Sequence, residues 1–133
     1  PIHTWHGERT LAYERTTSWV RSNIVQQPRT VREGDGWAEK IVGEHDLLYF
    51  TLRRLEFEKR IEDDTCGKFH VLTLVDGERI RIRSVAQPER YFDAEYMDMV
   101  VVPADMGRYV IENLRTEPIS VHKTMLKDGF DKE

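Results

Sequence analysis

The chain has 133 residues, of which 39% are hydrophobic and 33% charged, with a formal net charge of −4 and a pI near 5.8. This length and balance predict a single globular domain that is large enough to bury a core. The acidic balance argues against nucleic acid as a partner, and because no long apolar run is present we expect neither a membrane span nor a signal peptide.

The only cysteine, Cys66, cannot form an intramolecular disulfide, which fits a reducing compartment and predicts a cytoplasmic protein. The chain starts at Pro1. We therefore expect either that an initiator methionine was removed or that the domain was cut from a longer protein.

In chain order, residues 1–17 show no clear period and are expected to form an ordered N-terminal arm. Residues 18–126 are expected to form the folded domain, and residues 127–133 a C-terminal tail that frays. At the start of the domain, alternation predicts a strand over Ser18–Val25. The run Trp37–Val42 predicts about two helical turns, ended by Gly43.

From residue 49 onward, short apolar or alternating runs are separated by turn residues, which is typical of strands. A polar turn is expected over residues 62–65, and Gly77 is expected to link two strands as a hairpin. Many short strands with hardly any helix predict a β-sandwich or barrel. The expected strands are Tyr49–Phe57, Phe69–Val75, Arg79–Ser84, Met97–Val102, Tyr109–Asn113 and Ser120–Met125.

Two stretches carry a resemblance to a known fold. Phe69–Glu78 is an apolar strand that runs into an Asp-Gly-Glu turn, and Met99–Asn113 holds an apolar strand stopped by Pro103 and Ala104 before another strand begins. This order resembles the two halves of a cupin motif. The resemblance implies an all-β protein, a cupin-type jelly-roll β-barrel with an N-terminal arm and little helix.

Cupin metal sites take two histidines and a glutamate from the first half-motif and one histidine from the second. On that template His70 stands at the glutamate position, Asp64 and Cys66 fall near the two histidine positions, and Arg108 takes the last one. An arginine cannot ligate a metal, and its permanent charge repels a cation. We therefore favour a shell without a metal site, and the alternative is an unusual site of Asp64, Cys66 and His70.

A narrower resemblance covers Ser18 to Leu126. The runs Asp46–Phe57, Asp64–Glu78 and Val101–Leu114, in this order and spacing, resemble the C-terminal domain of class I mannose-6-phosphate isomerases. In that family the zinc ligands sit in the N-terminal cupin and include a Gln-x-His pair, which this sequence lacks. The resemblance implies an accessory domain without catalytic residues or a cofactor, whose zinc-binding catalytic domain is missing.

The parent protein would interconvert fructose 6-phosphate and mannose 6-phosphate, and the N-terminal catalytic domain would be a partner of this chain. One alternative is a stand-alone module that binds a sugar or sugar phosphate through His70, Arg108 and Tyr109, and another is a small metal-dependent cupin enzyme. A second copy of the chain, as a homodimer, is another candidate partner. The tryptophans Trp5, Trp19 and Trp37 are expected to lie against the barrel or at an interface.

One further pattern has a simpler interpretation. Arg79, Arg81 and Arg83 alternate with Ile80 and Ile82 along one expected strand. Three arginines on one face could bind a phosphate. We instead expect a solvated outer face with the two isoleucines inside, because successive side chains of a strand point to opposite sides.

Overall fold

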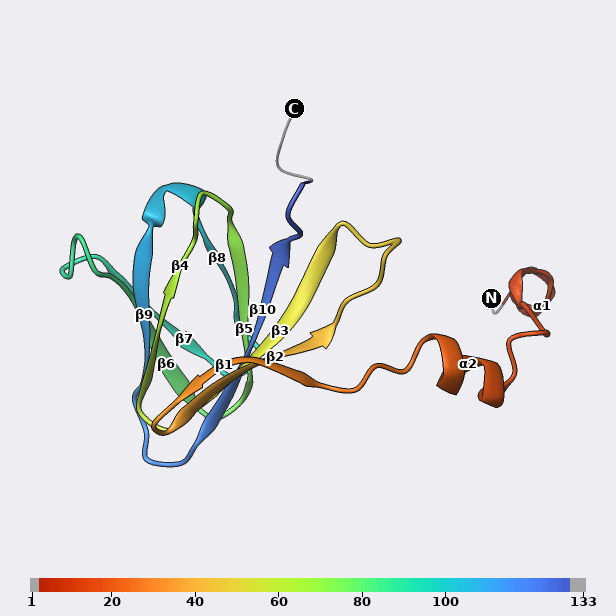
Figure 1. The fold of residues 1–133 in the computed structure, drawn as a ribbon, viewed down its shortest axis with the longest axis horizontal. Helices are drawn as coiled ribbons and strands as arrows, with labels where there is room; N and C mark the ends of the chain where they lie inside the picture. Colours follow the sequence, from red (N-terminus) through yellow and green to blue (C-terminus); the bar gives the residue numbers. More distant parts are fainter. Residues whose placement is uncertain (1–2, 130–133) are drawn as a thin grey trace.

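The protein is described by a computed structural model over residues 3–129. Two antiparallel sheets pack face to face, and an N-terminal arm with two short helices extends away from them (Figure 1). The predicted all-β class, with an N-terminal arm and little helix, is confirmed. None of the helices in residues 3–129 is long and apolar enough to cross a membrane.

The six-stranded sheet contains both the first and the last strand of the chain. In spatial order its strands are β1 (Arg29–Gly34), β2 (Trp37–Gly43), β3 (Phe50–Phe57), β10 (Ile119–Leu126), β5 (His70–Asp76) and β8 (Met99–Val102). The four-stranded sheet has the order β4 (Arg60–Asp64), β9 (Arg108–Asn113), β6 (Arg79–Ser84) and β7 (Tyr91–Glu95). A short 3₁₀ turn, η1 (Ala104–Met106), precedes β9.

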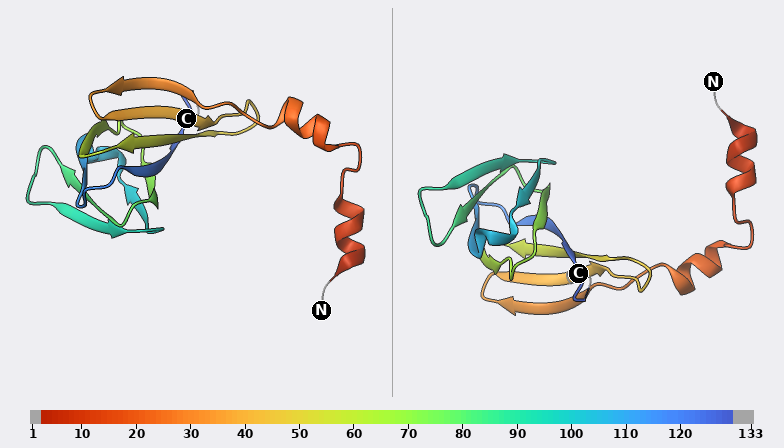
Figure 2. Two further views of the ribbon diagram at one scale, coloured as in Figure 1. Left: turned by 90° about the horizontal axis from the view of Figure 1, so that it is seen from below. Right: turned by 90° about the horizontal axis from the view of Figure 1, so that it is seen from above.

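The two sheets face each other in both views of Figure 2, and the core residues come from strands of both sheets. Alternate residues of each strand point inward, so strands with apolar residues at every second position bury them together. Ile80 and Ile82 are buried and the arginines beside them are not, which confirms that expectation. The buried apolar side chains include Leu55, Phe57, Ile61, Leu72, Leu74, Ile80, Ile82, Val102, Ile111, Ile119 and Val121.

The arm consists of α1 (Thr4–Thr10) and α2 (Thr17–Asn23), and neither helix buries a residue. The strand predicted over Ser18–Val25 is therefore wrong. The side-chain oxygen of Thr16 accepts a hydrogen bond from the backbone N–H of Trp19, and this N-cap starts α2. Trp5 is exposed on α1 and does not pack against the barrel, so only an interface is left of the prediction for it, whereas Trp37 packs against the core.

Three other predictions in the barrel are wrong. Trp37–Val42 is not helical but forms most of β2, because pairing with β1 and β3 on its two sides overrides its weak helical pattern. Residues 62–64 of the predicted polar turn belong to β4, which pairs with β9. Gly77 does not close a hairpin, since β5 and β6 lie in different sheets and the turn between them carries the chain across. Strands β1 and β7 were not predicted.

Candidate functional site

The barrel interior holds a cluster of charged side chains from three strands. Lys123 of β10 and Glu39 of β2 are buried, the side chain of Asp63 of β4 is 8% exposed, and the ammonium group of Lys123 bridges the two carboxylates. Its Nζ lies 2.8 Å from Oε1 of Glu39. A buried charge is tolerated only when it is paired, so these three groups fix one another inside the core.

Two arginines complete the pairing of the carboxylates. Arg53 lies 3.0 Å from Oε1 of Glu39, while Arg32 pairs with Oε2 of Glu39 and lies 2.8 Å from Oδ1 of Asp63. Burial alone would raise the pKa of Glu39, but the charge of Lys123 and the hydrogen bonds from Lys123 and the two arginines lower it to about 2. Glu39 is therefore ionised throughout the physiological range.

A hydrogen-bonded chain links this cluster to His70. The hydroxyl of Tyr109 donates to Oδ2 of Asp63 at 3.1 Å, and the same hydroxyl lies 2.7 Å from Nδ1 of His70. Because the Tyr109 proton points to the carboxylate, Nδ1 of His70 carries a proton and donates to the Tyr109 oxygen. Burial and the neighbouring Asp63 charge raise the pKa of Tyr109 well above its usual value, so it stays protonated.

The other ring nitrogen of His70, Nε2, is buried and has no hydrogen-bond partner among the described residues. Burial, and then the positive charge of Lys123, lower the pKa of His70 to about 4. At neutral pH the imidazole is thus uncharged. Within residues 3–129 it acts as a proton donor to Tyr109 and is not an ion-pair partner of Asp63, whose Oδ2 lies 3.9 Å away.

Of the three residues predicted to bind a ligand, the structure brings together His70 and Tyr109 but not Arg108. The Arg108 side chain is 65% exposed and pairs with Glu62 on the outer face. The cupin template sets Arg108 at a ligand position, which would face the barrel interior, but the structure places it one residue out of register. β4 and β9 pair Asp63 with Tyr109 and Asp64 with Arg108, and the first of these pairs faces inside. A shift of one position moves a strand residue to the opposite face.

The alternative metal set is not assembled either. Asp64 is exposed, and its carboxylate accepts a hydrogen bond from the backbone N–H of Cys66 in the β4–β5 turn, while His70 is inside the barrel. No group of three His, Cys, Asp or Glu side chains in residues 3–129 is arranged to hold a metal ion. Asp63, Glu39 and His70 do converge, but three cationic side chains already neutralise the two carboxylates. A divalent ion does not fit there, because it would meet Lys123 at close range.

Sequence reasoning missed Glu39, Asp63 and Lys123. For Lys123 a signal was present: along β10 it shares its side with Ile119 and Val121, so alternation alone places it inside. No comparable signal marks Glu39, because the residues around it were interpreted as a helix. The partner of each charge comes from a strand distant in sequence, and only the folded chain reveals it.

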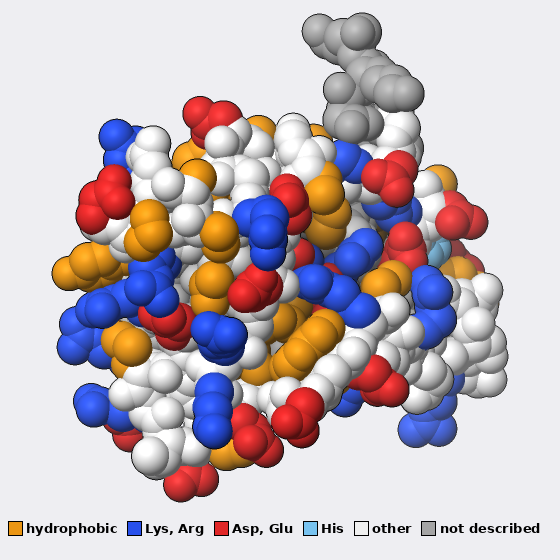
Figure 3. All heavy atoms as spheres, turned by 60° about the vertical axis from the view of Figure 1, so that its left-hand side comes forward, with side chains coloured by type: hydrophobic (Ala, Val, Ile, Leu, Met, Phe, Trp, Pro, Cys, Tyr) orange, Lys and Arg blue, Asp and Glu red, His pale blue; other side chains and the backbone are white. Residues whose placement is uncertain are grey.

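Outside the barrel, charges of both signs are interspersed on the side of the four-stranded sheet (Figure 3). Arg79 and Arg81 pair with Asp93, and Arg83 pairs with Glu112. These arginines are therefore neutralised by their own sheet and are not grouped for a phosphate.

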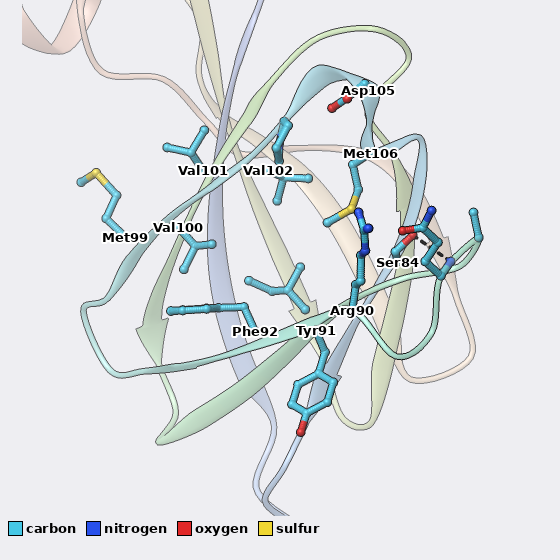
Figure 4. Close-up of a pocket in the computed structure, with 14 residues that line it drawn as sticks. Ser84, Arg90, Tyr91, Phe92, Met99, Val100, Val101, Val102, Asp105 and Met106 are labelled. Carbon is cyan, nitrogen blue, oxygen red and sulfur yellow. Dashed lines mark hydrogen bonds between the residues drawn. The ribbon is translucent and has the colours of Figure 1, made fainter.

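A cleft of about 770 Å³ opens between β7 and β8. The core residues Ile82 and Val102 are among those that line it. Phe92 and Val100 line it as well (Figure 4). Arg90 and Ser84 lie at one end of the cleft. The cleft is separate from the ionic cluster, none of whose members lines it.

Comparisons with known proteins find solved structures with a similar fold. No family model and no curated protein sequence matches the chain. Among solved structures, the Cnp3 cupin domain of Schizosaccharomyces pombe is similar with a TM-score of 0.55 and 15% identity, over 69% of this chain and 65% of that one. The plu4264 protein of Photorhabdus luminescens gives 0.61 and 15%, over 81% and 91% of the two chains.

A cupin 2 conserved barrel domain protein of Rhodopseudomonas palustris gives a TM-score of 0.56 and 11% identity, over 75% of this chain and 70% of that chain. At such low identities the likeness concerns architecture and not activity. The chain therefore has the cupin fold.

Proposed function

We propose that this chain is a non-catalytic cupin domain that accompanies a separate catalytic domain in a cytoplasmic protein of the mannose-6-phosphate isomerase type. The observation that carries the proposal is the Lys123 ammonium group, paired with Glu39 and Asp63 in the barrel interior. Interconversion of an aldose and a ketose needs a positioned base and an electrophile, usually a metal, that stabilises the enediolate. Among residues 3–129, the barrel interior offers no metal site, and its one histidine is closed off from substrate.

The buried histidine does not supply the missing base. Nδ1 of His70 is engaged with Tyr109, and the ring is 1% exposed, so a substrate proton has no route to Nε2 in this arrangement. What the cluster does instead is join the two sheets: Lys123 and Glu39 belong to the six-stranded sheet, and Asp63 and Tyr109 to the four-stranded one. We assign it a structural role.

The link to mannose-6-phosphate isomerases rests on the order and spacing of the three sequence runs that end at Leu114. Those runs map onto β3, β5 and the β8–β9 region, which contribute core residues from both sheets. A stand-alone sugar-phosphate module gains less support, because Arg108 and Tyr109 point to opposite sides of β9.

Two measurements test the proposal. A coupled assay of the purified chain with mannose 6-phosphate and added zinc is expected to show no turnover above background. Turnover that survives repurification and is abolished in His70→Ala would overturn the non-catalytic role.

The coding sequence upstream of Pro1 tests the association with a catalytic domain. We expect it to encode a second cupin domain with a Gln-x-His pair. A start codon directly before Pro1, with no such domain, would exclude the accessory role and leave a stand-alone module.

A further inference from the structure

The cleft between β7 and β8 has the size and the lining of a small-molecule site. Its volume of about 770 Å³ lies within the range of ~300–1,000 Å³ that ligand pockets occupy. Of the 14 residues that line the cleft, ten are apolar, and these include all four residues of β8. The four polar or charged ones are Ser84, Gln87, Arg90 and Asp105. A mostly apolar cleft with a few polar groups is typical of a site that orients a bound molecule.

The turn from β6 to β7 sets Ser84 and Arg90 at the same end of this cleft (Figure 4). The backbone N–H of Ser84 donates to the carbonyl oxygen of Arg90 at 3.2 Å, and the backbone N–H of Arg90 donates to that of Gln87 at 2.9 Å. In the view of Figure 4 the Arg90 side chain runs toward Met106, which also lines the cleft. The two polar side chains are therefore held close together by the backbone of one short turn.

Both side chains keep hydrogen-bond donors that the rest of the described chain does not use. Within residues 3–129 no ion pair or hydrogen bond engages the guanidinium group of Arg90, whereas Arg81 on the neighbouring strand is paired with Asp93. The side chain of Ser84 is buried, and its Oγ accepts the backbone N–H of Gln87 at 3.2 Å. Its own proton has no acceptor among the same residues. Because buried hydroxyl groups donate as well as accept, this proton indicates an acceptor from outside the chain.

A carboxylate satisfies both groups, since its two oxygens match the planar fork of a guanidinium and also accept from a hydroxyl. Asp105 lines the cleft too and is not paired with Arg90 in the described structure, so a second negative group on the ligand would meet an unpaired carboxylate. We propose that the cleft binds a monocarboxylate with an apolar body. The carboxylate lies on Arg90 and Ser84, and the apolar body lies against Phe92 and Val100.

This site is distinct from the barrel interior. None of the residues of the ionic cluster around Lys123 lines the cleft, so the proposed ligand does not displace a buried charge pair. The proposal also does not depend on a catalytic domain elsewhere in the protein, because every residue it uses belongs to this chain.

Octanoate is the probe for the first test. It is titrated into the ¹⁵N-labelled 133-residue chain while the backbone amide shifts are followed by NMR. The amides of Arg90, Phe92 and Val100 should shift and saturate with a dissociation constant below ~1 mM, which is modest for a ligand of this size. The absence of saturable shifts at these amides up to about 10 mM octanoate would overturn the proposal.

Arg90→Gln should raise the dissociation constant for octanoate at least ~10-fold, because a hydrogen bond to a charged group is lost. Arg60→Gln is the matched control: Arg60 is an exposed arginine on β4 of the same sheet and does not line the cleft, so the same change of charge should leave binding unchanged. Equal weakening in the two variants would reduce the effect to general attraction of an anion and overturn the site.

Phe92→Ser is the second variant and tests the apolar wall. Phe92 is 56% exposed, so the substitution leaves the core intact, and octanoate binding should weaken by ~5-fold or more as apolar contact is lost. The amide spectrum of each variant without ligand checks that it is folded. Unchanged affinity in folded Phe92→Ser would overturn the placement of the apolar body.

Three related molecules separate the parts of the ligand. Octan-1-ol keeps the chain without the charge, acetate keeps the charge without the chain, and octanedioate adds a second carboxylate. Each should bind at least ~10-fold more weakly than octanoate. Octan-1-ol or octanedioate at equal strength would overturn the single-anion site, and acetate at equal strength would show only adventitious anion binding.

Discussion

Nδ1 of His70 on β5 lies 2.7 Å from the hydroxyl of Tyr109 on β9, so one hydrogen bond spans the two sheets of the barrel. The same hydroxyl donates to Asp63, which is paired with Lys123. The neutral imidazole is thus coupled to the charged centre of the core. This arrangement makes the stability of the domain depend on pH in a defined window.

The free energy of unfolding should fall between about pH 6.5 and pH 4 because of His70. The pKa of His70 is lowered to about 4 in the folded protein, so as pH falls below 6.5 the unfolded chain binds the proton first and is favoured. Below pH 4 both states are protonated and the loss levels off at ~3 kcal/mol. Burial also lowers the pKa of His122, so the wild-type curve alone does not isolate His70.

Chemical denaturation across this pH range, in the wild type and in His70→Asn, isolates the contribution. Asparagine keeps an N–H donor for Tyr109 but does not titrate. The difference between the two curves should be flat above pH 6.5 and change by a few kcal/mol down to pH 4. A difference that stays constant over the whole range would contradict the buried, neutral His70.

Lys123→Met should destabilise the domain strongly. Removing the ammonium group leaves Glu39 and Asp63 buried with less positive charge, and breaking a buried ion pair on one side costs ~3–5 kcal/mol. Lys40→Met is the matched control, because Lys40 pairs with Glu56 at a partly exposed site where such a pair contributes at most ~1 kcal/mol. Equal losses of unfolding free energy in the two variants would show that the cluster is not desolvated as described.

Gly77→Ala should cost more stability than Gly67→Ala. Both glycines have positive φ, 119° and 77°, so alanine is strained at each by ~1–2 kcal/mol. A Cβ on Gly77 would clash with Cγ2 of Ile119 in the core, whereas a Cβ on Gly67 meets no atom within 4 Å. We therefore expect Gly77→Ala to lower the free energy of unfolding by ~3 kcal/mol or more. Urea unfolding of the two variants checks the order, which a reversed ranking would refute.

The purified chain should contain no stoichiometric zinc, iron or nickel, because Lys123 and the two arginines already neutralise the interior carboxylates. Elemental analysis of protein purified without chelators is the direct measurement. About one metal per chain that disappears in His70→Ala would contradict this prediction and favour a metal-dependent cupin.

The sequence alone determined the architecture because its signal is local. Strands such as Arg79–Ser84 alternate cleanly, and the Asp-Gly-Glu and Pro103-Ala104 breaks delimit the two half-motifs, so six of the ten strands and their order follow from short-range pattern. The resemblance to cupins came from that same order. His70 was also singled out correctly as an inward-facing residue of its strand.

The tertiary structure decided what the sequence left ambiguous. Trp37–Val42 is a strand because β1 and β3 pair with it, and the choice of Tyr109 over Arg108 as the inward residue depended on a register that no local pattern fixes. The sequence did not predict the ionic cluster for the same reason. Glu39, Asp63 and Lys123 are far apart in the chain, and their charges become compatible with burial only when three strands bring them into contact.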